Sequence, residues 1–265
     1  MTLQYAQQGT GTPFMLLHAF PLSGAMWTRD AGRFARAARV ITPDLPGFGG
    51  SSRQPQPSIP AMAQAVADLL DALEIHEPVI LAGLSMGGYV ALEFMRQCPQ
   101  RVKALGLFST KAAADSPEQR EGRFTFIERL RREGVEALLQ TTLPKLVGAS
   151  TTARRPAVIA EIERYIRAAD REGVMDAVRA MAERRGSQPV LPTIPCPTLI
   201  IAGAEDALIP PKESEGMAQA IPGAQLQVIP EAGHLVNLEV PEAFQDLVAS
   251  WTRQVIEHSG IRGTG

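Results

Sequence analysis

The sequence predicts an α/β fold, with a mostly parallel, twisted sheet of about seven strands flanked by helices. Short apolar runs recur along the chain and do not alternate with polar residues, as is typical of strands covered on both faces. Segments with helical periodicity lie between these runs, and one long charged stretch contains helical segments but no convincing strand. We therefore expect a sheet protein with a helical insertion.

Each expected strand is a short run of apolar residues. The continuous runs lie at residues 14–17, 79–82, 104–108 and 198–202. Two weaker candidates lie at residues 40–42 and 225–229. The stretch before Phe14 leaves room for one strand and a turn at Gly9 and Gly11, but hardly for a hairpin. These segments together predict the strands of one sheet.

Apolar residues at three- and four-residue spacings predict the helices that cover the sheet. One set is Met62, Val66, Leu69, Leu70 and Leu73. A second set, near the C-terminus, is Phe244, Leu247, Val248, Trp251 and Val255. Right-handed crossovers between parallel strands would place helices on both faces of the sheet.

The charged stretch divides the predicted core into two parts. We expect a core formed by residues 1–111 and 190–258, with a helical cap at residues 112–189 and a flexible tail at residues 259–265. Prolines after Arg185 are typical of a linker that returns to the core. The many cap arginines are interpreted mainly as solvated helix faces, although one or two could meet an anionic substrate.

Composition excludes several classes of protein. The chain has 265 residues, 45% hydrophobic and 20% charged, with a formal net charge of −2, so it has no strong basic field for nucleic acid. Its apolar runs are too short to span a bilayer, and no secretory signal is visible at the N-terminus, so we expect a cytoplasmic protein without a membrane partner. Cys98 and Cys196 show no metal-ligand spacing and are expected to be unpaired thiols.

The strongest chemical motif is Gly83-Leu84-Ser85-Met86-Gly87, which fits G-x-S-x-G. It follows a predicted strand and precedes a helical run at residues 88–97. So tight a turn strains the serine backbone, and glycines two residues before and after it relieve the crowding. The Ser85 hydroxyl would then project at the sheet edge beside a helix N-terminus, where developing negative charge is favoured.

A serine nucleophile needs a base, and the chain offers four histidines: His18, His76, His234 and His258. His258 lies in the predicted tail, and His76 is interpreted as solvated surface between two glutamates. His18 is expected to be structural and to hold its loop by a side-chain hydrogen bond. His234 follows the last predicted strand, at the sheet edge where Ser85 is expected, and is the predicted base.

The base in turn needs a carboxylate to orient it, and two adjacent candidates follow the strand at residues 198–202. They are Glu205 and Asp206, and local physical reasoning does not choose between them. The oxyanion that forms during attack needs two N–H donors. We expect them to be the backbone N–H of Met86 and that of Phe20, in the loop after the first apolar run.

Five motifs together resemble the α/β-hydrolase family, in its carboxylesterase and 3-oxoadipate enol-lactonase branch. They lie at residues 16–21, 44–49, 83–88, 203–206 and 233–234. The resemblance implies Asp206 as the acid and the chain order Ser85, Asp206, His234. The glycines and proline that follow Asp44 are interpreted as shaping a turn after a strand, and no catalytic role is expected for Asp44. Ala19 departs from the family, which usually has glycine after the histidine at this position.

The resemblance and the site together predict a serine carboxylesterase that acts on a small-molecule ester or lactone, with no metal and no organic cofactor. Alternatives within this fold are a 3-oxoadipate enol-lactonase and a cofactor-free perhydrolase or haloperoxidase. A haloalkane dehalogenase is disfavoured, because it would need aspartate where Ser85 stands. From another class, the chain could be a ligand receptor with vestigial catalysis. The physiological substrate and the oligomeric state stay open.

Overall fold

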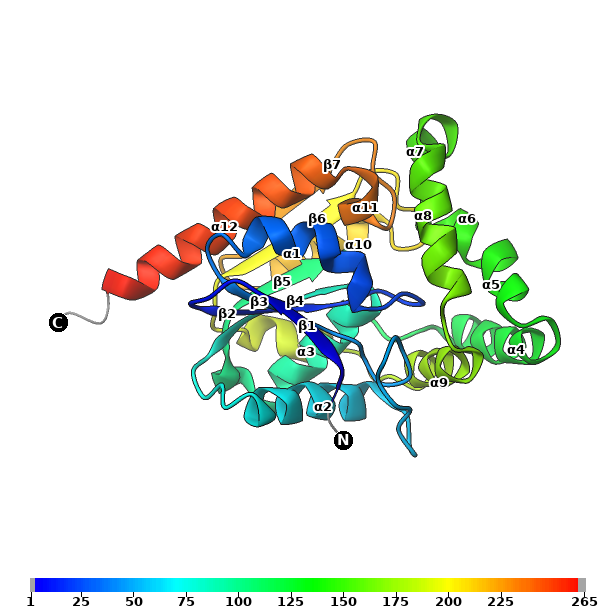
Figure 1. The fold of residues 1–265 in the computed structure, drawn as a ribbon, viewed down its shortest axis with the longest axis horizontal. Helices are drawn as coiled ribbons and strands as arrows, with labels where there is room; N and C mark the ends of the chain where they lie inside the picture. The colour runs from blue at the N-terminus through cyan, green and yellow to red at the C-terminus, as the bar shows by residue number, and fades with distance from the viewer. Residues whose placement is uncertain (1–2, 262–265) are drawn as a thin grey trace.

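A seven-stranded sheet forms the centre of the protein in the computed structural model, which describes residues 3–261 (Figure 1). The strand order is β1-β3-β2-β4-β5-β6-β7. Strand β1 is antiparallel to β3, and every other neighbouring pair is parallel. The strands are β1 (Tyr5–Gln8), β2 (Pro13–Leu17), β3 (Arg39–Pro43), β4 (Val79–Leu84), β5 (Val102–Phe108), β6 (Thr198–Gly203) and β7 (Gln225–Ile229). The predicted fold class is confirmed, including the single strand before Phe14.

Helices cover both faces of this sheet. Figure 1 shows α1 (Thr28–Phe34) and α12 (Pro241–Ile261) on one face, and α2 (Ile59–Ala72) and α3 (Met86–Gln97) on the other. The remaining core elements are η1 (Gly24–Trp27), η2 (Pro99–Arg101), η3 (Gln188–Thr193), α10 (Pro211–Ala220) and α11 (Val236–Glu239), and α11 lies between β7 and α12. All residues of β2, β4 and β6 are buried, as their continuous apolar sequences predict.

The starts of two helices follow from their capping residues. The Ser58 hydroxyl accepts the Ala61 N–H at the start of α2, and Pro60 occupies the first turn, where a missing N–H costs nothing. At the start of α4 (Pro117–Glu133), Ser116 and Gln119 form a reciprocal capping box. These caps fix where each helix begins. The apolar face of α2, including Met62, is then buried in the core.

Six helices separate β5 from β6 in the chain, and they lie together beside one edge of the core (Figure 1). They are α4 (Pro117–Glu133), α5 (Val135–Thr141), α6 (Leu143–Leu146), α7 (Ala149–Arg154), α8 (Pro156–Arg167) and α9 (Arg171–Ala182). We use the word cap for residues 112–189, which contain these helices. Between β5 and β6 the described chain contains helices and no strand, and the division into a core and a cap domain stays a prediction.

The cap touches the core closely where α7 begins. A Cβ atom added to Gly233 would stand 2.1 Å from the Gly148 nitrogen, so the two backbones meet without room for a side chain. The Glu239 carboxylate accepts the N–H groups of Gly148 (2.8 Å) and Leu235 (3.1 Å), one from the cap and one from the core. This junction therefore joins the cap to the loop that follows β7.

The C-terminal helix is longer than its apolar periodicity indicated. It continues to Ile261, so it includes the first three residues of the predicted tail, and residues 262–265 lie outside the described part of the chain. Among residues 3–261 no helix combines the length and the apolar character needed to cross a membrane.

Candidate active site

Ser85 lies at the turn between β4 and α3, in a conformation that few non-glycine residues adopt. Its φ is +55° and its ψ is −112°. The Ser85 N–H donates to the Phe108 carbonyl (2.9 Å), and the Thr110 hydroxyl donates to the Ser85 carbonyl (2.8 Å), so hydrogen bonds hold the backbone on both sides. The predicted strained turn is present.

The two glycines of the motif are required by close contacts. A Cβ atom on Gly83 would stand 2.1 Å from the Gly87 carbonyl oxygen, and one on Gly87 would stand 2.3 Å from the Leu17 carbonyl oxygen. Real Cβ atoms do not approach backbone oxygens so closely. Any larger residue at either position would therefore displace the turn that carries Ser85.

His234 and Asp206 form a buried pair at the same edge of the sheet. Nδ1 of His234 donates to Oδ2 of Asp206 (2.8 Å), and both side chains are fully buried. Asp206 Oδ1 accepts the N–H groups of Leu208 and Ile209, each at 2.9 Å, which fixes the carboxylate. Because Nδ1 is the donor, a neutral imidazole has its lone pair on Nε2. Within residues 3–261 this buried Nε2 has no hydrogen-bond partner, the Ser85 hydroxyl included.

Glu205, the other candidate for the acid that orients the histidine, has its hydrogen-bond partner in the cap. Its carboxylate accepts the N–H (2.7 Å) and the hydroxyl (2.5 Å) of Ser150, at the start of α7 in the cap. The hydrogen bonds from the Ser150 side chain and backbone lower the pKa of Glu205. The adjacent carboxylates thus have separate partners: Asp206 contacts the histidine, and Glu205 contacts the cap.

The two expected oxyanion donors come from two segments, the start of α3 and the loop after β2. Met86 is the first residue of α3, and N–H groups in the first turn of a helix have no acceptor within that helix. The Phe20 N–H also has no protein acceptor in the described part of the chain. Ala19 is not among the described non-glycine residues with positive φ, so the loop has no need of the glycine usual in the family.

His18 holds this loop against the turn after β3. Its Nδ1 donates to the Ala19 carbonyl (3.0 Å), and its Nε2 accepts the Leu45 N–H (2.9 Å). Burial lowers the pKa of His18 from 6.5 to about 4, against smaller raising effects from the Ala19 hydrogen bond and the Asp44 charge. His18 is therefore a neutral structural residue, and the prediction of a structural role is confirmed.

Of the other residues that the sequence singled out, all but His258 lie as expected. The Asp44 carboxylate accepts the N–H groups of Gly24 (2.8 Å) and Gly50 (2.9 Å) and so organises its turn. His76 is exposed. Cys98 and Cys196 are both free thiols. His258 belongs to α12, but its side chain lies outside the described part.

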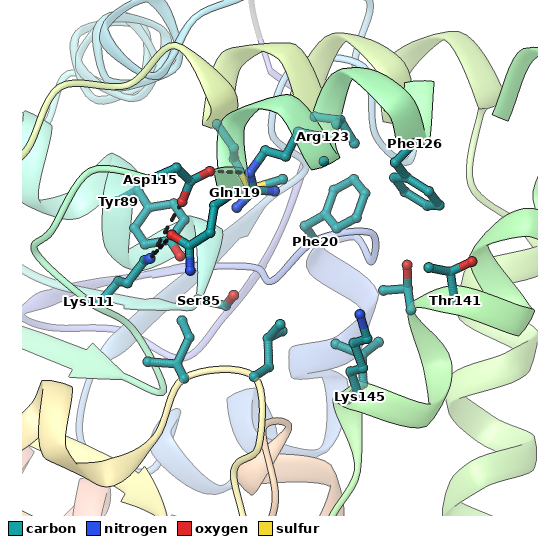
Figure 2. A pocket seen from close by; sticks show the side chains of 17 residues that line it. Phe20, Ser85, Tyr89, Lys111, Asp115, Gln119, Arg123, Phe126, Thr141 and Lys145 are labelled. Atoms are coloured by element: carbon teal, nitrogen blue, oxygen red, sulfur yellow. Dashed lines mark hydrogen bonds and ion pairs between the residues drawn. The ribbon is translucent and has the colours of Figure 1, made fainter. Parts of the chain in front are cut away.

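A cavity of about 350 Å³ lies between Ser85 and the cap, within the range usual for small-molecule sites. Figure 2 shows Ser85 facing this space, with Phe20 on the core side. The cavity also has apolar lining from the cap and the adjacent loops: Phe126, Leu146, Val178, Met181, Leu208 and Ile209.

One wall of this cavity is a cluster of charges around Asp115. Asp115 forms ion pairs with Arg123, with Arg184 (2.9 Å) and with Lys111 (3.5 Å). Burial acts to raise the pKa of Asp115, but the hydrogen bonds and charges of Arg123 and Arg184 hold it below its usual value. The Arg184 guanidinium also lies over the Tyr89 ring, 4.1 Å from its centroid. The carboxylate thus stays ionised among three cations.

Arg184 is an exception to the interpretation of the cap arginines as mainly solvated. It is buried, and its side chain also donates to the carbonyls of Met181 (2.7 Å) and Ala113 (2.9 Å). Sequence reasoning also missed Tyr89, Lys111 and Asp115 as lining residues. For Lys111 and Asp115, the only signal in the sequence was their position after the end of β5, at the sheet edge that carries Ser85.

Comparisons with known proteins show which proteins share this fold. A family model described as alpha/beta hydrolase fold matches residues 12–241. A solved structure of a thermophilic esterase from Thermogutta terrifontis, with malate bound, is 42% identical with a TM-score of 0.93, over 96% of this chain and 93% of that one. The enol-lactonase from Burkholderia xenovorans LB400 is 28% identical with a TM-score of 0.86, over 94% of this chain and 95% of that one.

A curated relative differs in length. The dihydrolipoyllysine-residue acetyltransferase component of the acetoin cleaving system from Pseudomonas putida is 31% identical over 257 residues. The match covers 92% of this chain but only 64% of that protein, so this chain spans less than two thirds of that relative.

Proposed function

Because the chain belongs to the α/β-hydrolase fold family, we propose that it is a serine hydrolase that cleaves small carboxylic esters through an acyl-enzyme on Ser85. The similarity to an esterase and an enol-lactonase supports an ester-cleaving enzyme. The single observation that carries the serine mechanism is the buried pair of His234 and Asp206, whose imidazole presents a lone pair without a partner.

The mechanism follows from the donors and acceptors of the site. His234 Nε2 takes the Ser85 proton as the Ser85 oxygen attacks the ester carbonyl. The charge that develops on the carbonyl oxygen is stabilised by the N–H groups of Met86 and Phe20, and each such donor contributes roughly 3 kcal/mol in the transition state. The imidazolium returns its proton to the leaving alcohol, and the acyl group stays on Ser85.

Water then completes the cycle by the same route. His234 removes a proton from water as the water oxygen attacks the acyl carbonyl, and Ser85 leaves with a proton from the imidazolium. Asp206 does not exchange a proton. It stabilises the imidazolium and keeps Nδ1 as the donor through the 2.8 Å hydrogen bond. Apart from the substrate and water, every group in this mechanism belongs to the chain itself.

A lactone is the second candidate substrate class, because the enol-lactonase from Burkholderia xenovorans shares the fold over nearly the whole chain. The same acyl transfer opens a lactone ring, and the leaving alcohol then stays attached to the acyl group. A panel that compares short-chain esters with enol-lactones separates the two substrate classes by their kcat/KM values.

The serine mechanism is tested by covalent labelling. Diethyl 4-nitrophenyl phosphate should abolish hydrolysis of 4-nitrophenyl butyrate and add one diethylphosphoryl group to the peptide that contains Ser85, as mass spectrometry would detect. Ser85→Ala should lose labelling and at least about 10³-fold in kcat while it keeps its fold. The control Ser214→Ala removes a buried hydroxyl in α10, away from the cavity, and should keep both activity and labelling. Full activity in Ser85→Ala would refute the assignment.

A further inference from the structure

Lys145 is unusual among the charged residues that line the cavity. It lies on the short helix α6 in the cap, and its side chain is exposed to the cavity space (Figure 2). Within residues 3–261 it forms no ion pair, and no hydrogen bond involves its ammonium group. Lys111, on the opposite wall, is bound to Asp115 and to the Gln119 side chain (3.2 Å). Lys145 therefore has its full hydrogen-bonding capacity free.

The lining of the cavity has an excess of positive charge. It contains three cationic residues, Lys111, Arg123 and Lys145, and a single carboxylate, Asp115. Arg184, behind the lining, adds a further cation to the same carboxylate. Asp115 is therefore fully engaged and cannot neutralise Lys145 as well. The potential in the cavity favours an anionic ligand.

The surroundings of Lys145 suit a small molecule with an apolar section and a charged end. Phe20 and Phe126 supply apolar walls, and Leu146 lies next to Lys145. These apolar walls suit the uncharged section of such a ligand. Of the neighbouring hydroxyls, that of Thr141 already accepts a hydrogen bond from Arg129 (2.8 Å). The ammonium group is thus the main unsatisfied polar group at this end of the cavity.

On the basis of the proposed function, we propose that the cavity selects esters that carry a carboxylate, and that Lys145 binds this carboxylate as a specificity-determining residue. Figure 2 shows Ser85 between the Asp115 cluster and Lys145. The scissile carbonyl would lie at Ser85, with the carboxylate extended toward α6. Lys145 acts on substrate choice and takes no part in proton transfer.

The test compares charged and neutral esters of equal size. On the acyl side, 4-nitrophenyl hydrogen glutarate is paired with 4-nitrophenyl pentanoate. On the alcohol side, 4-acetoxybenzoate is paired with 4-acetoxybenzamide. Lys145→Met should lower kcat/KM by about 10- to 100-fold for an anionic ester and by less than about twofold for its neutral partner, because only the anionic ester loses an ion pair. Lys145→Arg should restore most of the preference.

Lys212→Met is the matched control, because Lys212 is also exposed but lies on α10, outside the cavity lining. It should leave all kcat/KM values unchanged. A Lys145→Met loss confined to the glutarate ester places the carboxylate on the acyl side, and one confined to 4-acetoxybenzoate places it on the alcohol side. Equal effects on charged and neutral esters, or no effect on either anionic ester, would overturn the inference. If the wild-type protein hydrolysed none of these esters, the proposed function would fail and this inference with it.

Discussion

The core side and the cap side of the cavity are held in place by different interactions. Ser85 and His234 lie on tight backbone turns at strand ends, where close contacts and short hydrogen bonds leave little freedom. On the cap side, Asp115 is held by ion pairs between side chains. The Lys145 ammonium group has no partner within residues 3–261. The difference indicates that the backbone fixes the position of the proposed reacting groups, whereas side chains form the region that is proposed to choose the substrate.

The largest expected effect separates the two adjacent acids. Asp206→Asn should lower kcat by about 10³- to 10⁴-fold. Its amide oxygen can still accept from Leu208 and Ile209, which turns the NH₂ group toward His234 and favours the wrong tautomer. Glu205→Gln, the matched control, should change kcat less than about threefold, because Glu205 contacts Ser150 in the cap. Steady-state hydrolysis of 4-nitrophenyl butyrate measures both, and a larger loss in Glu205→Gln would reverse the assignment.

The next effect concerns the stability of the cap side. Asp115→Asn should lower the free energy of unfolding by about 3 kcal/mol, because it leaves the buried Arg184 charge without its carboxylate. The control Asp246→Asn breaks an exposed ion pair with Arg33 and should cost less than about 0.5 kcal/mol. Urea unfolding at neutral pH gives both values. Equal, small losses would show that the Asp115 cluster contributes little to stability.

A smaller effect concerns the pH dependence of stability that His18 causes in the loop after β2. The pKa of His18 is lowered from 6.5 to about 4 in the folded protein. Between pH 6.5 and pH 4, the unfolded chain therefore binds a proton on His18 that the folded protein does not bind. The contribution of neutral His18 is therefore complete above pH 6.5 and is lost as pH falls toward 4, with about 2 kcal/mol lost by pH 5. His18→Asn should be less stable at pH 7 but should lose this part of the pH dependence. Identical slopes for both proteins in urea unfolding between pH 7 and 5 would contradict the prediction.

The core side could be predicted from the sequence because its signals are local. The apolar runs and the spacing of Gly83, Ser85 and Gly87 depend on contacts within a few residues or between neighbouring strands. His234 was identified by its position after a strand. Asp206 was favoured over Glu205 only by the family resemblance, because the partners of the two neighbouring carboxylates are distant in the chain and cannot be predicted from local sequence.

The cap side was much less predictable. Helix α4 carries many charges and buries few of its residues, so its periodicity does not show which side faces the cavity. The burial of Arg184 follows from its partners Asp115 and Tyr89, which lie far apart in sequence. Whether Lys145 has a partner is likewise a matter of three-dimensional arrangement. The sequence patterns therefore predicted a cap. The partners of its charged side chains depend on three-dimensional packing and could not be predicted.

The contact between Gly148 and Gly233 has a practical consequence for protein engineering. Together with the bonds of Glu205 and Glu239, it fastens the start of α7 to the loop that carries His234. A chimera that takes its cap from a related enzyme should therefore exchange residues 112–145 and retain the junction that follows. Such a graft would replace Lys145, the proposed determinant of substrate preference, and the loop that carries His234 would keep its contacts with the start of α7.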